Sequence, residues 1–212
     1  EKLAARANLP MPKVYVMNSR VPNAFATGRN PQHAAVCVTT GLMDALTAPE
    51  IAGVLGHEMS HILHRDILVG TIAAVMAGTI SALTRFAFWF GGGRDRDRQN
   101  PIASLLILIL TPLMAMIIQL AISRTREYMA DEAGGALCGD PDELANALEK
   151  IDLAAHRTIM AGAQESSAHM FIISPFAGKE AKSLFSTHPA TEDRFRRLRE
   201  QAERMGTRQC IV

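Results

Sequence analysis

Two histidines and a glutamate form the pattern H-E-x-x-H in the stretch His57-Glu58-Met59-Ser60-His61. Residues four apart on a helix lie on one face, so the imidazoles of His57 and His61 can reach a single metal ion. Two neutral nitrogen ligands suit zinc, and Glu58 lies close enough to act as a general base toward a water at that ion. The alternative is an ordinary amphipathic helix that carries both histidines. The pattern therefore predicts a hydrolytic zinc site that needs a third ligand.

The surrounding residues predict the helix that this pattern requires. Thr47-Ala48-Pro49-Glu50 has the form of a capping box with an early proline, and an apolar run from Ile51 to Gly56 follows it. His64 falls on the same face as His57 but about 10 Å further along the helix axis. That distance is too long for one tetrahedral ion, so we do not expect His64 to be a ligand.

Three short β-branched or apolar runs before this helix predict a small sheet: Val14 to Met17, Ala24 to Thr27 and Ala34 to Thr40. A peptide-cleaving enzyme of this kind would bind an extended peptide along an exposed sheet edge. The candidate substrate-binding residues on that edge are Asn23, Ala24, Phe25 and Ala26. The alternative is a plain hairpin over Asn23 to Gly28, and spacing alone does not choose between the two.

Two long uncharged runs follow the H-E-x-x-H stretch. Ile67 to Thr84 contains 18 uncharged residues and Gln99 to Ser123 contains 25, with the polar turn Gly91 to Arg98 between them. About 20 helical residues cross a hydrocarbon core of roughly 30 Å, so these runs predict a helical hairpin in a membrane. The alternative is a pair of helices buried in a soluble core, for which 212 residues leave little room. The arginines near both ends of the hairpin do not determine its orientation.

A hairpin returns the chain to its starting side, so the residues after it can reach the H-E-x-x-H helix. Glu127 and Asp131 are four apart on the next predicted helix. A carboxylate from a neighbouring helix completes a His-His-Glu zinc site with a fourth position for water, and a second carboxylate can accept a hydrogen bond from a ligand histidine. Spacing favours Glu127 over Asp131 and Glu132 as the ligand only modestly, and an exposed charged helix face is the alternative.

The last third of the chain predicts two more helices. Asp140-Pro141 begins one that runs to about Ala155, and a charged amphipathic helix with Phe195 and Leu198 on its buried side ends near Gly206. The segment from His156 to Thr187 is either a mobile segment across a cleft or a plain loop. His188, which follows it, is a candidate site residue or an ordinary turn residue before Pro189.

Charge and cysteine content narrow the class of protein. The net charge of +1 and the lack of a basic patch with aromatic residues argue against nucleic-acid binding. The three cysteines are widely spaced, so they predict neither a zinc knuckle nor a disulfide framework and favour a reducing compartment.

The order of these parts resembles the HtpX-type membrane zinc metalloproteases, a gluzincin group related to the CAAX prenyl endopeptidases. The matching pieces are Asn23 to Gly28, Val38 to Leu42, His57 to His61, the hairpin, Ser123 to Asp131, and Thr187 to Pro189. The resemblance implies an α+β fold: a mainly helical, zincin-like protease domain with a small sheet and an inserted transmembrane hairpin. Residues 1–66 and 123–212 would form the two parts of that domain, and residues 67–122 the hairpin.

The resemblance also implies the roles of individual residues. One zinc ion per chain would be held by His57, His61 and Glu127, with Glu58 as the catalytic acid and base. Asp131 would accept a hydrogen bond from a ligand histidine and would not itself bind the zinc. His188 and Arg194 would lie near the active site, with His188 donating to the oxyanion.

A membrane setting and a substrate class follow from the same resemblance. The family works in the bacterial cytoplasmic membrane, as multi-pass proteins whose active site faces the cytoplasm, and degrades damaged or misassembled membrane proteins. Its partners are therefore polypeptide substrates and the lipid bilayer, with no nucleic acid. It usually has two further transmembrane helices ahead of the sheet, so this chain resembles a truncated member.

Two other functions remain as alternatives. The first is a non-catalytic membrane adapter whose zinc site is structural or vestigial. The second is a soluble helical interaction domain without a metal. The sequence does not indicate a cleavage-site preference, a mode of regulation or an oligomeric state.

Overall fold

A computed structural model of the chain describes residues 1–90, 101–157 and 191–206, with the backbone alone for residues 87–90, 101–106, 112 and 155–157. These parts are mainly helical and include one three-stranded sheet, which confirms the predicted α+β fold. The elements in chain order are α1 (Lys2–Arg6), β1 (Lys13–Met17), β2 (Ala24–Gly28), the 3-10 turn η1 (Pro31–His33), β3 (Ala34–Thr39), α2 (Thr40–Ala45), α3 (Ala48–Leu63), α4 (Asp66–Phe90), α5 (Pro101–Cys138), α6 (Pro141–Arg157) and α7 (Thr191–Met205).

The sheet has the order β1-β3-β2, so β2 is an edge strand. β3 runs parallel to β1 and antiparallel to β2, with Ala26 opposite Val36. Alternate residues of β3 are buried, as expected for a strand with one face on the core. The helix α2 was not predicted. It begins because the Thr39 hydroxyl at the end of β3 accepts a hydrogen bond from the Leu42 N–H and caps the new helix.

The central helix α3 begins as the sequence predicted. Thr47 and Glu50 form a reciprocal capping box, with Pro49 in the first turn. α3 then packs between the sheet, α5 and α6. Its buried Val54 joins a core that includes Leu42, Leu144 and Leu198. The helix is thus held on several sides before its last two turns, which carry the histidines.

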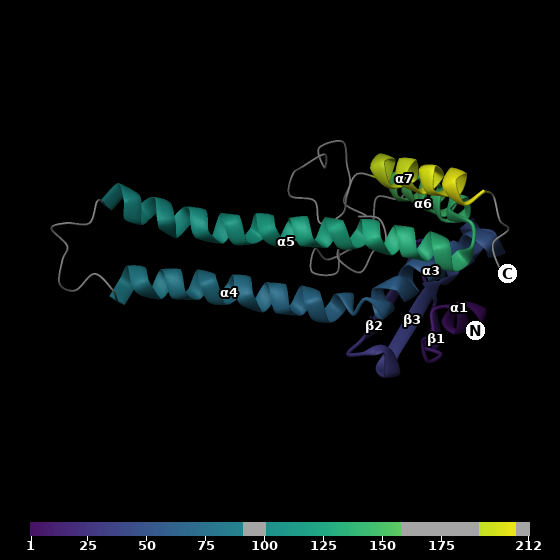
Figure 1. Cartoon of the computed structure of the whole chain (residues 1–212), viewed down its shortest axis with the longest axis horizontal. Coiled ribbons are helices and arrows are strands. Elements are labelled where there is room, and N and C mark those ends of the chain that lie inside the picture. The colour runs from purple at the N-terminus through teal and green to yellow at the C-terminus, as the bar shows by residue number, and fades with distance from the viewer. Residues whose placement is uncertain (91–100, 158–190, 207–212) are drawn as a thin grey trace.

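The predicted hairpin is formed by α4 and α5, which lie side by side and extend away from the other elements (Figure 1). Asp66–Phe86 and Ile107–Cys138 are each long and apolar enough to cross a membrane, and 0% and 6% of their apolar stretches are buried. Apolar side chains on both helices therefore face outward, among them Val75 and Ile118. The alternative of two helices buried in a soluble core is wrong because, among the residues that the structure describes, the apolar stretches of both helices stay almost entirely exposed. The predicted turn lies outside the described residues.

α5 is one continuous helix of 38 residues that leaves the hairpin and enters the body of the protein. α6 and α7 follow the predicted helices closely, and Leu198 of α7 is buried. Cys138 is disulfide-bonded. The sequence predicted that the cysteines form no disulfide framework, and it gave no indication of a bond at Cys138, because spacing along the sequence does not measure distance in the fold. The predicted segment from His156 to Thr187 begins two residues later than expected, because α6 continues through Arg157. The rest of that segment and His188 lie outside the described residues.

Candidate metal centre

A close crossing of α3 and α5 brings the H-E-x-x-H pattern beside Glu127. Gly56 and Gly134 meet at this crossing, and a Cβ atom added to Gly134 would lie 2.6 Å from the backbone nitrogen of His57. A side chain at either position would force the helices apart. Glu127 lies two turns before Gly134 on α5, so the same crossing places its carboxylate against the face of α3 that carries the histidines.

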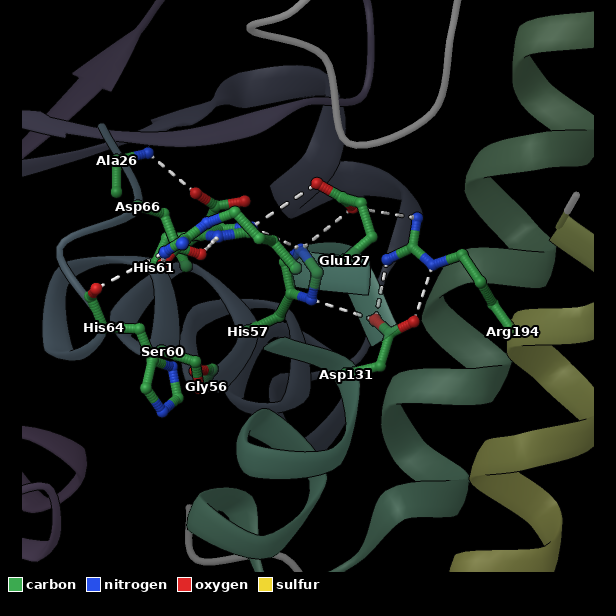
Figure 2. Close-up of polar contacts among 12 residues, drawn as sticks. Ala26, Gly56, His57, Ser60, His61, His64, Asp66, Glu127, Asp131 and Arg194 are labelled. Atoms are coloured by element: carbon green, nitrogen blue, oxygen red, sulfur yellow. Dashed lines mark hydrogen bonds and ion pairs between the residues drawn. The ribbon is translucent and has the colours of Figure 1, made fainter. Parts of the chain in front are cut away.

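The side chains of His57, His61 and Glu127 converge on one point, where one ligand atom from each lies within 4.8 Å of the others (Figure 2). The Nε2 atoms of the two histidines are 3.1 Å apart. The Glu127 oxygens lie 3.8 Å from Nε2 of His57 and 3.7 Å from Nε2 of His61. His57 is fully buried, whereas His61 and Glu127 are 18% and 13% exposed at their side chains, so the cluster opens on their side.

The other ring nitrogen of each histidine, Nδ1, contacts a carboxylate. Nδ1 of His57 lies 2.9 Å from Asp131 Oδ1, and Nδ1 of His61 lies 2.6 Å from Asp66 Oδ2. A carboxylate accepts and cannot donate when ionised, so it stabilises the tautomer with the proton on Nδ1. Each Nε2 then carries a lone pair directed at the other histidine and at Glu127.

This donor set fits a metal cation. Two lone pairs and a carboxylate directed at one another repel unless a positive charge lies between them. Zinc binds histidine nitrogens at ~2.0–2.1 Å, and at a tetrahedral angle this puts two such nitrogens about 3.4 Å apart. The observed 3.1 Å between the Nε2 atoms differs from this by a few tenths of an ångström. Nitrogen and carboxylate ligands in this number are typical of zinc sites.

Glu58 lies beside this cluster and contacts the edge strand. Its side chain is buried, and its Oε2 accepts a hydrogen bond of 2.7 Å from the backbone N–H of Ala26 on β2. Burial raises the pKa of the Glu58 carboxyl, while the neighbouring His57 and His61 lower it and do not offset the burial. A raised pKa brings a carboxylate closer to the range in which a general base works near neutral pH.

Arg194 connects α7 to the same cluster. Its Nε and Nη2 each donate a 2.7 Å hydrogen bond to Asp131, and its Nη1 lies 3.6 Å from Glu127 (Figure 2). Burial alone would lower the pKa of Arg194, but the Asp131 carboxylate outweighs it and raises the pKa, so the guanidinium stays charged. The structure thus brings Asp131 and Arg194 together beside the cluster.

The four predicted substrate-binding residues lie at the start of β2. Asn23 is buried, and its N–H and C=O both bond to Thr39, the former to the hydroxyl and the latter to the N–H. The side chain of Ala24 is in the core, and Phe25 is half-buried. Ala26 bonds to Glu58, so its N–H points away from β3 and toward the open edge of the sheet.

The structure separates His64 from the cluster and adds two residues that the sequence did not predict. His64 is exposed, caps the C-terminus of α3, and directs its ring away from His57 and His61 (Figure 2). Asp66 and Arg126 lie at the base of the hairpin, where the sequence suggested only flanking charges. A signal was present in the position of Asp66, five residues after His61 and just beyond the end of α3, where the chain can fold back.

Comparisons with known proteins agree with this geometry. The sequence profile of peptidase family M48 matches residues 1–202. A "Protease HtpX homolog" from Syntrophotalea carbinolica is 55% identical over 93% of this chain and 73% of its own length. A second, from Persephonella marina, is 50% identical over 97% of this chain and 74% of its own length.

A similar fold occurs in a solved structure, that of S. mikatae Ste24p, with a TM-score of 0.56 and 22% identity. The match covers 93% of this chain and 49% of that one, so the chain spans about half of Ste24p. The profile match and the HtpX homologues together show that this chain belongs to peptidase family M48 and is a membrane metalloprotease.

Proposed function

We propose that this protein is a zinc endopeptidase that binds one zinc ion through His57, His61 and Glu127 and uses Glu58 as its acid and base. The observation that carries the proposal is the convergence of two Nε2 lone pairs and a carboxylate on one point, with both Nδ1 atoms held by carboxylates. Among the described residues this cluster has three members, one fewer than a closed structural zinc site uses. Three ligands favour a catalytic site with an open position.

Zinc, when bound, would polarise the scissile carbonyl and make an adjacent water more acidic. The rest of the chemistry belongs to the protein. Glu58 takes the proton from the attacking water and returns it to the leaving amine. The Ala26 N–H holds one Glu58 oxygen at the sheet edge. Asp131 and Arg194 keep His57 in position, and His188, outside the described residues, would donate a hydrogen bond to the oxyanion.

The substrate would bind as an extended strand antiparallel to β2, along Asn23, Ala24, Phe25 and Ala26. Support comes from the position of β2 at the edge of the sheet and from the contact of Ala26 with Glu58. A peptide on that edge would lie directly beside the general base. Backbone hydrogen bonds of this kind accept many sequences, which suits an enzyme that removes damaged proteins.

The cellular setting is part of the proposal. We place the protein in the bacterial cytoplasmic membrane as a multi-pass protein with its active site toward the cytoplasm, where it degrades damaged or misassembled membrane proteins. Residues 1–66 and 123–212 would form the protease domain around the hairpin of residues 67–122. The exposed apolar faces of α4 and α5 and the HtpX homologues support the membrane setting.

The experiment compares the chain and its Glu58→Gln variant, both purified in detergent. We expect about one zinc per chain in each, cleavage of an unfolded substrate such as casein by the parent alone, and loss of cleavage on chelation with recovery on adding zinc. Glutamine keeps an oxygen that can accept from Ala26, so the variant should fold normally. Zinc bound without cleavage by the parent chain would instead favour the non-catalytic adapter, and full cleavage by Glu58→Gln would refute the role of Glu58.

A further inference from the structure

The ring of His61 is fixed by Asp66, the first residue of α4, at the point where the chain enters the membrane hairpin. Its Nδ1 lies 2.6 Å from Oδ2 of Asp66, closer than the 2.9 Å between Nδ1 of His57 and Asp131. Asp66 is the first residue of α4, and its side chain is 11% exposed. A short bond to a largely desolvated carboxylate orients the imidazole and stabilises the tautomer that presents Nε2 to the cluster.

The other helix of the hairpin holds Asp66 in turn. Arg126 of α5 forms an ion pair with the second oxygen of Asp66, and its Nη2 also donates to the backbone carbonyl of His64 at 3.3 Å. Arg126 is 19% exposed at its side chain, so the pair is partly shielded from water. The arginine therefore joins the end of α3, the start of α4 and the middle of α5.

A tight turn makes this contact possible. Arg65 has a positive φ of 54°, a left-handed conformation that a residue with a Cβ atom adopts only at a cost in free energy. The left-handed residue ends α3 and sends the chain into α4 so that Asp66 faces His61, one turn back. The contacts that follow, from Asp66 to His61 and to Arg126, offset the strain of the turn.

The two histidines of the cluster have matching supports from different parts of the fold. Nδ1 of His57 lies 2.9 Å from Asp131, which is held by Arg194 of α7, a helix in the body of the protein. His61 bonds to Asp66, which is held by Arg126, and both of these residues belong to the hairpin helices. Asp131 also lies on α5, so both supports use that helix. They differ in the arginine that holds the carboxylate, which comes from α7 for His57 and from the base of the hairpin for His61.

We propose that Asp66 and Arg126 are positioning residues through which the base of the hairpin holds His61 in its metal-binding orientation. The inference rests on the proposed function, because it needs a metal at His57, His61 and Glu127. By this inference, the junction between the start of α4 and the adjoining part of α5 belongs to the metal centre. A change in the distance between these two helices would therefore change the orientation of the His61 ring.

The test measures zinc affinity, by competition with a chromophoric chelator, for the parent chain and for Asp66→Asn, Arg126→Gln and the double variant. Removal of an outer hydrogen-bond partner of a ligand typically weakens metal binding 10–100-fold, and we expect this for Asp66→Asn. Arg126→Gln should give a smaller loss, and in the Asp66→Asn background it should add none, because it acts through Asp66. Arg126→Lys should bind zinc more tightly than Arg126→Gln but less tightly than the parent chain.

A second readout separates positioning from general destabilisation. The visible absorption of the cobalt-loaded protein reports the ligand geometry, and it should change in Asp66→Asn and Arg126→Gln. In cleavage assays at saturating zinc, these variants should lose kcat with little change in KM. Arg65→Gln is the matched control, since Arg65 is exposed and contributes only its backbone to these contacts. It should match the parent in zinc affinity and in the cobalt spectrum.

The outcomes distinguish the two proposals. If the parent chain binds no zinc, the proposed function fails and takes this inference with it. If the parent binds zinc and His61→Ala abolishes binding, while Asp66→Asn binds as tightly with an unchanged cobalt spectrum, only the inference is overturned. If Asp66→Asn lowers the unfolding temperature of the metal-free protein, the zinc affinity and cobalt spectrum of Arg126→Gln become the deciding measurements. If the losses of zinc affinity in the two single variants add up in the double variant, the inference is overturned.

Discussion

Arg194 carries a permanent charge at 1% exposure, which is tolerable only because Asp131 meets it with two hydrogen bonds. The same carboxylate faces Nδ1 of His57. Asp131 therefore has two partners: its ion pair with Arg194 stabilises the fold, and its contact with His57 stabilises the tautomer that binds a metal. Loss of the arginine would leave the Asp131 carboxylate buried without the cation that offsets its charge.

We predict that Arg194→Met destabilises the metal-free protein by about 3–5 kcal/mol, because it breaks a buried ion pair on one side. Arg194→Lys should restore little of this, since an ammonium cannot reproduce the two parallel hydrogen bonds. Both variants should also bind zinc more weakly. Thermal unfolding with and without zinc measures the two effects.

Arg196→Gln provides the control on the same helix. Arg196 pairs with Asp193 in solvent, and its side chain is 63% exposed. Its loss should leave both the unfolding temperature and the zinc affinity unchanged. Equal behaviour of the Arg194 and Arg196 variants would contradict the role given to the buried ion pair.

At the level of single residues, the sequence was most informative where spacing alone fixes geometry. His57 and His61 share one helix face, so their convergence followed from the helical repeat. Glu127 was favoured only modestly over its neighbours, because its approach depends on how α5 crosses α3. Asp66 and Arg126 were missed for a related reason. Their contact depends on the left-handed turn at Arg65, a residue type that rarely adopts that conformation.

At the level of helices, the metal cluster depends on the crossing of α3 and α5. Gly134 allows it, because a Cβ atom there would lie 2.6 Å and 2.7 Å from backbone atoms of His57. Backbone atoms of a packed helix cannot move aside as a flexible side chain can. The distance between the helices at this point therefore determines how far Glu127 stands from the two histidines.

We predict that Gly134→Ala pushes α5 away from α3, lowers the stability of the metal-free protein by roughly 1–3 kcal/mol, and weakens zinc binding. Gly78→Ala is the matched control, because Gly78 is also in a helix and a Cβ atom there meets nothing within 4 Å. Zinc competition and thermal unfolding on both variants measure the difference. A Gly134→Ala protein with parental zinc affinity would show that the crossing distance does not set the site.

The sequence predicted most of the helices and strands but not how they meet. Capping residues such as Thr47 and Asp140 marked the starts of α3 and α6, and β-branched runs marked the strands. The parallel pairing of β1 with β3 depends on long-range contacts that no local pattern encodes. The short helix α2 was not predicted because its N-cap residue, Thr39, also belongs to the strongest strand pattern in the sequence.

On the scale of the whole molecule, the hairpin and the body follow different rules of solvation. In the body, apolar side chains are buried in a core shared by α3, α6 and α7. Along the hairpin, large apolar side chains face outward over most of the two helices. Contiguous apolar surface of this extent is not stable in water, and lipid is the solvent that suits it.

Val75 tests this division, since it lies near the middle of the apolar part of α4 with 62% of its surface exposed. An arginine at the centre of a membrane helix raises the free energy of insertion by about 2.5–3.5 kcal/mol. We therefore predict that Val75→Arg sharply lowers the fraction of protein that stays with membranes after alkaline extraction. Leu153→Arg is the control: Leu153 is 53% exposed but lies on α6 in the body, where an arginine meets water. Val75→Leu should stay with the membranes to the same extent as the parent. If Val75→Arg and Leu153→Arg stayed in the membrane equally well, α4 would not face lipid at this position.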